Sequence, residues 1–217
     1  MKISEIFYSV QGEGFSLGLS AVFVRLSGCN LKCDFCDTKY SWNEGLEMNS
    51  EEVFGRINTL SYKGRVIITG GEPLCQKDEL TYLCEMLKMD GWFIECETNG
   101  TISPGKLLEY IDQWNVSPKT KETLLSINQT PQSFGVHTNK LYIKLVVESD
   151  LHQLAWAKEF KDLNPSFPTD HIILMPCATN ILDQINILKP IIEEAKKEGY
   201  RVSPRLQILV WGQKKGV

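Results

Sequence analysis

Short apolar runs that alternate with amphipathic stretches limit what this chain can fold into more than any other feature of its sequence. Six such runs occupy residues 21–26, 65–69, 92–96, 113–117, 141–147 and 171–175. Most of them are apolar nearly throughout, which is the pattern of parallel strands covered on both faces. A further run, residues 206–210, predicts a last strand near the C-terminus.

Helix patterns fill the gaps between these runs. They cover residues 78–89, 151–160 and Ile181–Glu198. We expect Ser149 and Asn180 to cap the last two helices, and Pro190 to kink or split the last one. Alternating strands and helices predict an α/β fold in one domain, residues 1–217, built as an open doubly wound sheet or a partial barrel. Both architectures bind ligands at the carboxyl ends of strands.

The composition excludes several classes of protein. Of the 217 residues, 42% are hydrophobic, as in soluble globular proteins. The net charge of −4 argues against a broad nucleic-acid surface. Without a membrane-length apolar run or a signal-peptide pattern, we expect a cytoplasmic protein with no membrane partner. Seven cysteines, an odd number in such a chain, argue against a disulfide framework.

Three cysteines follow the first predicted strand. Cys29, Cys33 and Cys36 form a CxxxCxxC motif, so one loop can bring three thiolates to one metal centre. Structural zinc takes four ligands, and the three His of the chain all lie in its second half. A [4Fe-4S] cluster with three protein ligands leaves one iron open. We favour the cluster over zinc and over three unligated thiols.

The CxxxCxxC motif resembles the signature of the radical S-adenosylmethionine superfamily. There the open iron binds S-adenosylmethionine, and an electron from the cluster cleaves it to a 5′-deoxyadenosyl radical. Phe35 stands where the superfamily usually has an aromatic residue near the adenine. Gly70-Gly71-Glu72-Pro73, after the second strand, resembles the GGEP loop, whose backbone groups and carboxylate can hold the methionine ammonium.

Gln11-Gly12-Glu13-Gly14 precedes the first predicted strand. We do not interpret it as a phosphate-binding loop, because no predicted strand comes before it and its spacing differs from GxGxxG. Together with the other motifs it resembles the 7-carboxy-7-deazaguanine synthase family. The resemblance implies a partial (β/α) barrel of about six parallel strands with reduced helices. It also implies ring contraction of 6-carboxy-5,6,7,8-tetrahydropterin to 7-carboxy-7-deazaguanine, with loss of ammonia, in queuosine and 7-deazapurine biosynthesis.

The resemblance further implies which residues act. The three cysteines would hold the cluster, and Thr38 would bind Mg²⁺. The residues implied for S-adenosylmethionine are Phe35, Asp37, Gly71, Glu72, Ser117, Pro118, Lys119, Met175, Pro176, Cys177 and Ala178. Those implied for the pterin are Gln11, Gly12, Glu13, Arg25, Thr69, Gln207 and Val217. Gln207 is the nearest polar residue to the position where many members have a substrate-contacting His.

Other residues have simpler interpretations. Glu97 and Thr98 could reach the site from the end of the third strand, although an Asn-Gly turn follows them. Cys75, Cys84 and Cys96 are expected to be small core residues.

The resemblance implies a flavodoxin or ferredoxin-type electron donor and a homodimer, with no nucleic-acid partner. Two alternatives share the cysteine motif: an activase of glycyl-radical enzymes and a non-enzymatic iron–sulfur electron carrier. The Gln11–Gly14 motif, Arg25 and Asp37-Thr38 favour the small-molecule enzyme over the activase.

Overall fold

A computed structural model describes residues 1–60, 64–127, 134 and 139–217. Its strands are β1 (Lys2–Val10), β2 (Ser20–Leu26), β3 (Leu46–Glu47), β4 (Arg65–Gly70), β5 (Phe93–Thr98), β6 (Gln113–Val116), β7 (Leu141–Val147), β8 (Ile172–Pro176) and β9 (Arg201–Val202). Its α-helices are α1 (Ser50–Leu60), α2 (Lys77–Met89), α3 (Leu107–Tyr110), α4 (Lys121–Ser126), α5 (His152–Leu163), α6 (Ile181–Glu198) and α7 (Leu206–Trp211). Short 3-10 helices occupy Lys39–Trp42, Pro73–Gln76 and Thr169–His171.

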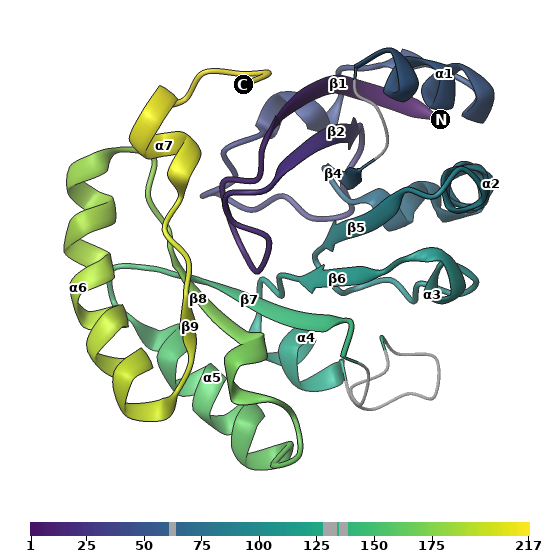
Figure 1. The fold of residues 1–217 in the computed structure, drawn as a ribbon. Helices are drawn as coiled ribbons and strands as arrows, with labels where there is room; N and C mark the ends of the chain where they lie inside the picture. Colours follow the sequence, from purple (N-terminus) through teal and green to yellow (C-terminus); the bar gives the residue numbers. More distant parts are fainter. Residues whose placement is uncertain (61–63, 128–133, 135–138) are drawn as a thin grey trace.

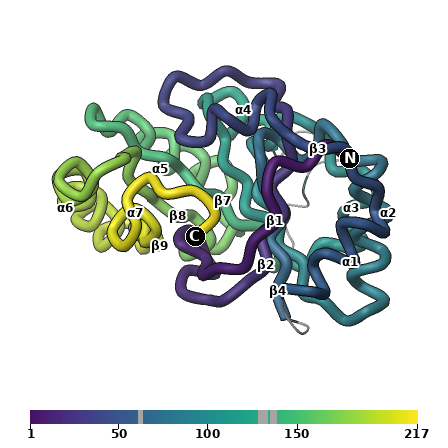
Figure 2. Tube along the Cα trace, turned by 90° about the horizontal axis from the view of Figure 1, so that it is seen from above, coloured from purple at the N-terminus to yellow at the C-terminus, as the bar shows by residue number. Residues whose placement is uncertain are grey.

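The strands form one curved sheet with an open side, and helices α1 to α6 lie around its outer face (Figure 1). The C-terminal residues lie beside β1 in two views at right angles (Figures 1 and 2). Within the described ranges, none of the helices combines the length and the apolar character needed to cross a membrane. The curved sheet and the helices on its outer face together make the molecule an open barrel.

The order of the strands is β3-β1-β2-β4-β5-β6-β7-β8-β9. Strands β2 and β4 to β9 run parallel to one another, whereas β1 pairs antiparallel with both β2 and β3. The six predicted parallel strands correspond to β2, β4, β5, β6, β7 and β8. The expected α/β fold with a partial barrel is confirmed.

Side chains along these strands alternate between the two faces of the sheet. On β5, Ile94 and Cys96 belong to the main hydrophobic core under the helices, whereas Glu97, which follows Cys96, lines the cavity inside the curve. On β7, Ile143 and Leu145 belong to the same core, while Lys144 faces inward. The inner face therefore carries charged groups, and the outer face holds the helices.

Strand β1 was not predicted. It pairs with β2 from Ile3 to Val10, so a strand does precede Gln11, contrary to our expectation. Most residues of β1 are only partly buried, and charged residues interrupt its apolar ones. It therefore lacks the continuous apolar run by which the central strands were recognised. The spacing argument against a phosphate loop is unaffected.

The predicted last strand is wrong, because residues 206–210 lie in helix α7. The amides of Ile208 and Leu209 both donate to Arg205 O, which begins the helical turn. Pro204 cannot donate to a ladder hydrogen bond, and β9 ends at Val202 just before it. A five-residue apolar run fits a helical turn as well as a strand, so periodicity alone could not decide.

The helix signals were partly right. Asn180 caps α6, its Oδ1 accepting from Asp183 N at 2.9 Å, as predicted. Pro190 does not split α6, which continues to Glu198. The expected Ser149 cap is wrong: α5 begins after Leu151, whose side chain makes no capping hydrogen bond. Helices α1, α3 and α4 were not predicted.

Candidate functional site

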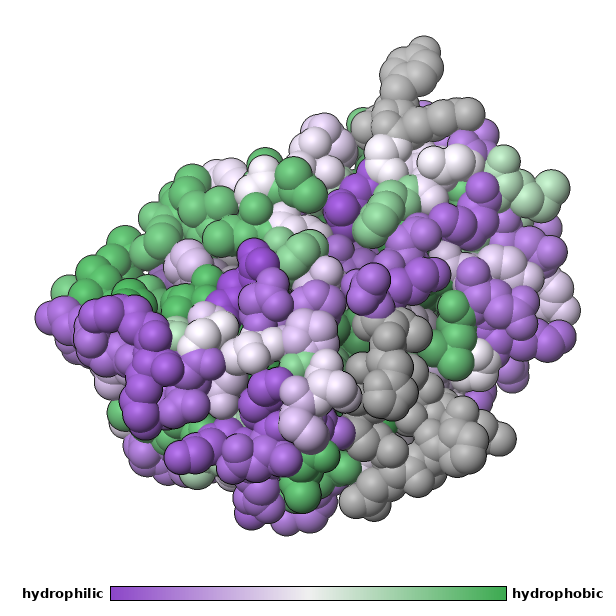
Figure 3. Space-filling view, turned by 60° about the horizontal axis from the view of Figure 1, so that its bottom comes forward, coloured by the Kyte–Doolittle hydropathy of each residue, from purple (hydrophilic) through white to green (hydrophobic). Residues whose placement is uncertain are grey.

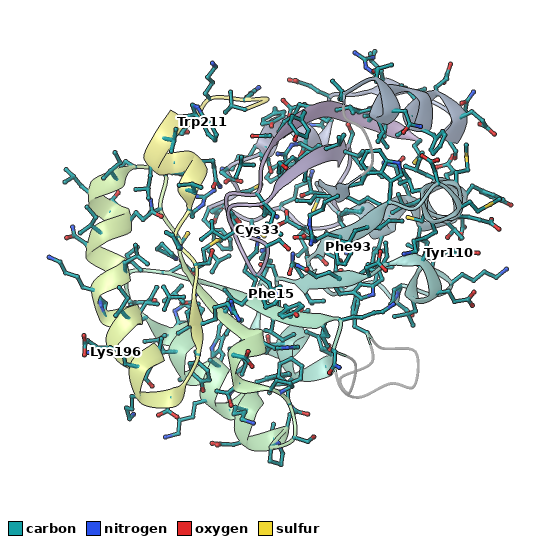
Figure 4. The ribbon with its side chains drawn as sticks, viewed as in Figure 1. Phe15, Cys33, Phe93, Tyr110, Lys196 and Trp211 are labelled. Carbon is teal, nitrogen blue, oxygen red and sulfur yellow. The ribbon has the colours of Figure 1, made fainter. Side chains whose placement is uncertain are left out.

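A cavity of about 260 Å³ lies inside the curve of the sheet, at the carboxyl ends of its parallel strands. The three motif cysteines, Thr38 and all the residues expected to bind the pterin line it. The residues expected to bind S-adenosylmethionine that line it are Phe35, Asp37, Gly71, Ser117, Lys119, Met175 and Cys177. Those outside its lining are Glu72, Pro118, Pro176 and Ala178. Figure 4 shows Cys33 near the middle of the molecule, within the curve.

The cysteine loop fits an iron–sulfur cluster. Cys29, Cys33 and Cys36 are partly buried free thiols that line one cavity. Burial raises the pKa of Cys29 and of Cys33, so ionisation of these thiols would accompany metal binding. Among the described residues, no three Cys, His, Asp or Glu converge on a single ion. A cubane cluster does not require such convergence, because each thiolate binds a different iron.

The Gly70-Gly71 pair lets the GGEP loop touch the loop that precedes Cys29. A Cβ on Gly71 would lie 2.0 Å from Gly28 O, and Gly70 adopts φ +146°, a conformation that favours glycine. Glu72 N donates to Gly28 O at 2.8 Å, which joins the two loops.

The carboxylate of Glu72 is fully buried behind this loop. It accepts from Leu74 N at 3.0 Å, Thr98 Oγ1 at 2.7 Å and Asn99 N at 2.7 Å. Burial raises the pKa of Glu72, and these hydrogen bonds oppose that rise. The side chain therefore ties the GGEP loop to the end of β5, and its predicted contact with S-adenosylmethionine stays a prediction.

Two carboxylates and a lysine share the inner wall of the cavity. Lys144 Nζ lies 2.8 Å from Glu13 Oε2 and 3.3 Å from Glu97 Oε1. Glu97 also accepts from Thr69 Oγ1 at 2.9 Å and from Gln11 Nε2 at 3.2 Å. The loop after β1 is thereby joined to β4, β5 and β7 by charged and polar side chains.

Arg205 joins three further segments. Its Nε donates to Glu13 Oε1 at 3.0 Å, its Nη1 to Ala178 O at 2.6 Å, and its Nη2 pairs with Asp37. Burial would lower the pKa of Arg205, but Glu13 and Asp37 outweigh it and raise that pKa. The Gln207 Nε2 donates to Glu13 Oε1 at 2.5 Å, so the start of α7 also contacts this carboxylate.

Arg25 lines the same cavity, from β2. Its Nε donates to Glu5 Oε2 at 2.9 Å, and the same oxygen accepts from Tyr40 Oη at 2.8 Å. Burial raises the pKa of Tyr40 to about 12, so the phenol stays a neutral donor. With Nε held in this way, the two Nη groups of Arg25 are suited to grip a ligand carboxylate.

Sequence reasoning missed two of the charged residues that line the cavity, Lys144 and Arg205. Lys144 had a recognisable signal, because a lone charge inside an apolar strand needs a partner when buried. Arg205 had no such signal, because it follows a proline outside any predicted element. Glu97 and Thr98, considered only as residues that could reach the site, both line the cavity.

The interpretation of the remaining cysteines was right for Cys84 and Cys96, which are buried, and wrong for Cys75, which is exposed. Cys75 lies in the 3-10 helix after the GGEP turn, where Pro73 and Leu74 are the buried residues.

Comparison with known proteins shows which family the chain resembles. The model of the Radical SAM superfamily matches residues 23–120. The chain is 38% identical to the 7-carboxy-7-deazaguanine synthase of Pyrobaculum aerophilum, over 100% of this chain and 97% of that protein. It is 33% identical to the synthase of Hyperthermus butylicus, over 97% and 92%. The crystal structure of QueE from Escherichia coli matches with a TM-score of 0.68 at 26% identity, over 94% of this chain and 93% of that one.

The open barrel, the cysteine loop and the superfamily match define a radical S-adenosylmethionine enzyme. Within that class, the chain belongs to the 7-carboxy-7-deazaguanine synthase family. It is therefore a lyase of 7-deazapurine biosynthesis that uses a [4Fe-4S] cluster and S-adenosylmethionine. The activase and electron-carrier alternatives are set aside.

Proposed function

We propose that the cavity is the active site in which this chain contracts the ring of 6-carboxy-5,6,7,8-tetrahydropterin to give 7-carboxy-7-deazaguanine. One observation carries the proposal: the cysteines of the cluster motif and the polar residues expected to bind the pterin line the same cavity. Cofactor and substrate could therefore be held side by side.

Cys29, Cys33 and Cys36 would hold the cluster. Residues from the ends of β4, β6 and β8 would surround S-adenosylmethionine: Gly71, Ser117, Lys119, Met175 and Cys177. When bound, this pair supplies the radical that takes a hydrogen atom from the pterin. The chain itself would orient the two molecules and keep water away from the radical.

The pterin would lie among the polar side chains that line the cavity. Arg25 would grip the substrate carboxylate through its Nη groups, since Nε is occupied by Glu5. Glu13 and Glu97 would accept hydrogen bonds from ring N–H groups. Gln207 can donate and accept but does not titrate near pH 7, so we assign it no proton transfer.

A magnesium ion would complete the site beside the cysteine loop. Thr38 lines the cavity, with Oγ1 3.7 Å from Cys36 Sγ. Mg²⁺ keeps much of its water and needs few protein ligands, so one hydroxyl together with substrate oxygens would suffice.

The test is an anaerobic assay of reconstituted protein with dithionite, S-adenosylmethionine, Mg²⁺ and carboxytetrahydropterin. The expected product is 7-carboxy-7-deazaguanine, identified by mass spectrometry. Cys33→Ala should abolish turnover, whereas Cys75→Ala, outside the motif, should retain it. Cleavage of S-adenosylmethionine with the pterin untouched would contradict the proposed substrate, and no 4Fe absorption would contradict the cluster.

The magnesium site has its own test. Thr38→Ala should raise the Mg²⁺ concentration needed for half-maximal turnover and leave the cluster spectrum unchanged. An unaltered Mg²⁺ response would remove Thr38 from the metal site.

We further propose a cytoplasmic homodimer that receives electrons from a flavodoxin or ferredoxin. Apolar side chains gather on the left of Figure 3, the side on which α6 lies, and the exposed ones on α6 include Ile181, Leu182 and Ile185. This exposed apolar surface supports self-association. Light scattering should give twice the chain mass, and a monomer at all concentrations would contradict the dimer.

A further inference from the structure

Lys144 is an unusual residue for its place in the fold. It sits in the middle of β7, between two core residues that face the helices, and only 6% of its side chain is exposed. A buried ammonium group is costly unless it is closely paired. Its retention inside the barrel therefore calls for a role that an apolar residue could not fill.

The partners of Lys144 are two carboxylates from separate parts of the chain. Glu13 lies in the loop after β1, and Glu97 lies on β5, with Lys144 Nζ at 2.8 Å and 3.3 Å from them. Two carboxylates this close to one point repel each other, and without a cation between them one tends to take up a proton.

Both carboxylates are also held by neutral or charged donors on their other sides. Glu13 Oε1 accepts from Arg205 Nε at 3.0 Å and from Gln207 Nε2 at 2.5 Å. Glu97 is held by the Thr69 hydroxyl and the Gln11 amide. Their orientation is thus fixed from several elements, while both still line the cavity.

The charge balance argues against Lys144 as a proton donor. Burial opposes its charge, but Glu13 and Glu97 outweigh burial and raise the pKa of Lys144. Burial likewise opposes ionisation of Glu13, but Lys144 and Arg205 outweigh it and hold the pKa of Glu13 well below its usual value. An ammonium with a raised pKa is a poor acid, and a carboxylate with a lowered pKa is a poor base.

Other charged groups nearby do not replace this role. Lys119, after β6, has a pKa lowered by burial and by the charge of Lys144, and its Nζ donates to Ser117 Oγ at 2.7 Å. Glu95, on the same face of β5 as Glu97, pairs with Arg65 at 2.8 Å. Only Lys144, among the described residues, contacts both Glu13 and Glu97 by an ion pair.

We propose that Lys144 is a positioning residue that keeps Glu13 and Glu97 together as paired hydrogen-bond acceptors for an N–H-rich heterocycle. A reduced pterin, whose ring nitrogens carry hydrogens, is such a ligand, and this choice of ligand rests on the proposed function. The assignment of Lys144 rests only on its contacts with the two carboxylates.

Ligand binding tests the proposal. Carboxytetrahydropterin is titrated calorimetrically into the reconstituted enzyme with S-adenosylmethionine but no reductant, so that nothing turns over. Lys144→Met should weaken pterin binding about tenfold or more, because Glu13 and Glu97 lose the ammonium that holds them in place as acceptors for the ligand. Lys144→Arg should recover most of the affinity. Lys140→Met, an exposed lysine just before the same strand, is the matched control and should bind as the wild type does.

A second measurement does not depend on the ligand. The carboxyl resonance of Glu13, in the full chain labelled with ¹³C-glutamate and identified by its loss in Glu13→Gln, is followed against pH by NMR. In the wild type and in Lys140→Met, the Glu13 carboxylate should remain ionised at pH values below 4.5, the usual pKa of a glutamate. In Lys144→Met it should titrate at a higher pH.

The outcomes separate the two proposals. If the wild type fails to bind the pterin while Glu13 titrates as expected in all variants, the proposed substrate is wrong and Lys144 keeps its role. If Lys144→Met binds the pterin within twofold of the wild type, or leaves the Glu13 titration unchanged, the positioning role is wrong.

Discussion

At the scale of single residues, the contact between the GGEP loop and the cysteine loop depends on Gly71. Its missing side chain leaves room for Gly28 O, which a Cβ would meet at 2.0 Å. We expect Gly71→Ala to lower the free energy of unfolding by about 1–3 kcal/mol, because backbone must move. It should also reduce cluster incorporation, since the moved segment leads directly into Cys29. Thermal unfolding and iron content after reconstitution measure the two effects.

The same substitution elsewhere provides the control. Gly55 lies inside α1, and a Cβ there would meet nothing within 4 Å. Gly55→Ala should raise the free energy of unfolding by about 0.5–1 kcal/mol, because alanine is the better helix former. If Gly71→Ala also stabilised the protein and took up a full cluster, the close contact between the loops would be wrong.

Single residues were predictable where a local motif announced them. Cys29, Cys33 and Cys36 stand at a spacing that only a shared metal centre explains simply, and they do line one cavity. Lys144 and Arg205 belong to no motif. Their importance comes from partners more than 130 positions away in sequence, such as Glu13. A contact of that kind depends on the tertiary fold and leaves only a weak trace in the local sequence.

At the scale of elements, the entry to α6 depends on Asn180, whose side chain satisfies an otherwise unpaired amide of the first turn. We expect Asn180→Ala to lower the free energy of unfolding by about 1 kcal/mol. Asn186→Ala, an exposed change within the same helix, should not lower it, because alanine has the higher helix propensity. Urea unfolding of both variants measures the difference, and equal effects would contradict the capping role.

Elements were predictable where burial left a strong pattern. The central strands are buried along nearly their whole length, which favours continuous apolar runs, so β2 and β4 to β8 were recognised. Strand β1 lies near the edge of the sheet and carries a mixed sequence, and α7 is a single turn or two beside the open side. Neither element buries enough side chains to give its sequence a clear hydrophobic periodicity. Strand β1 was therefore missed, and α7 was predicted as a strand.

At the scale of the whole molecule, the site exists because the sheet curves. Segments that are distant in the sequence meet only inside that curve: the loop after β1, the cysteine loop, the strand ends and the start of α7 all line the cavity. The sequence could predict that functional residues follow strands, since parallel strands share one carboxyl edge. It could not predict which inward residues pair with each other, because that depends on register and curvature.

This pairing across the molecule makes stability depend on pH through Glu13. Lys144 and Arg205 hold the pKa of Glu13 below 4.5 despite burial. A carboxyl whose pKa is lowered by folding adds stability above its unfolded pKa and loses it as the pH falls towards the folded pKa. The stability difference between the wild type and Glu13→Gln should therefore shrink as the pH falls below 4.5, by at most about 1.4 kcal/mol per pH unit.

Urea unfolding from neutral pH into the acid range measures this difference, with Glu51→Gln, an exposed change on α1, as the control. The control should differ little from the wild type at any pH, because an exposed carboxylate in water gains little from folding. A Glu13 difference that stays constant down to the acid limit would mean that the charge of Glu13 does not tie its loop to β7 and to the segment before α7. The Glu13 contacts across the barrel would then depend on packing and neutral hydrogen bonds, and the ion pairs of Glu13 with Lys144 and Arg205 would not make the stability of the protein sensitive to acid.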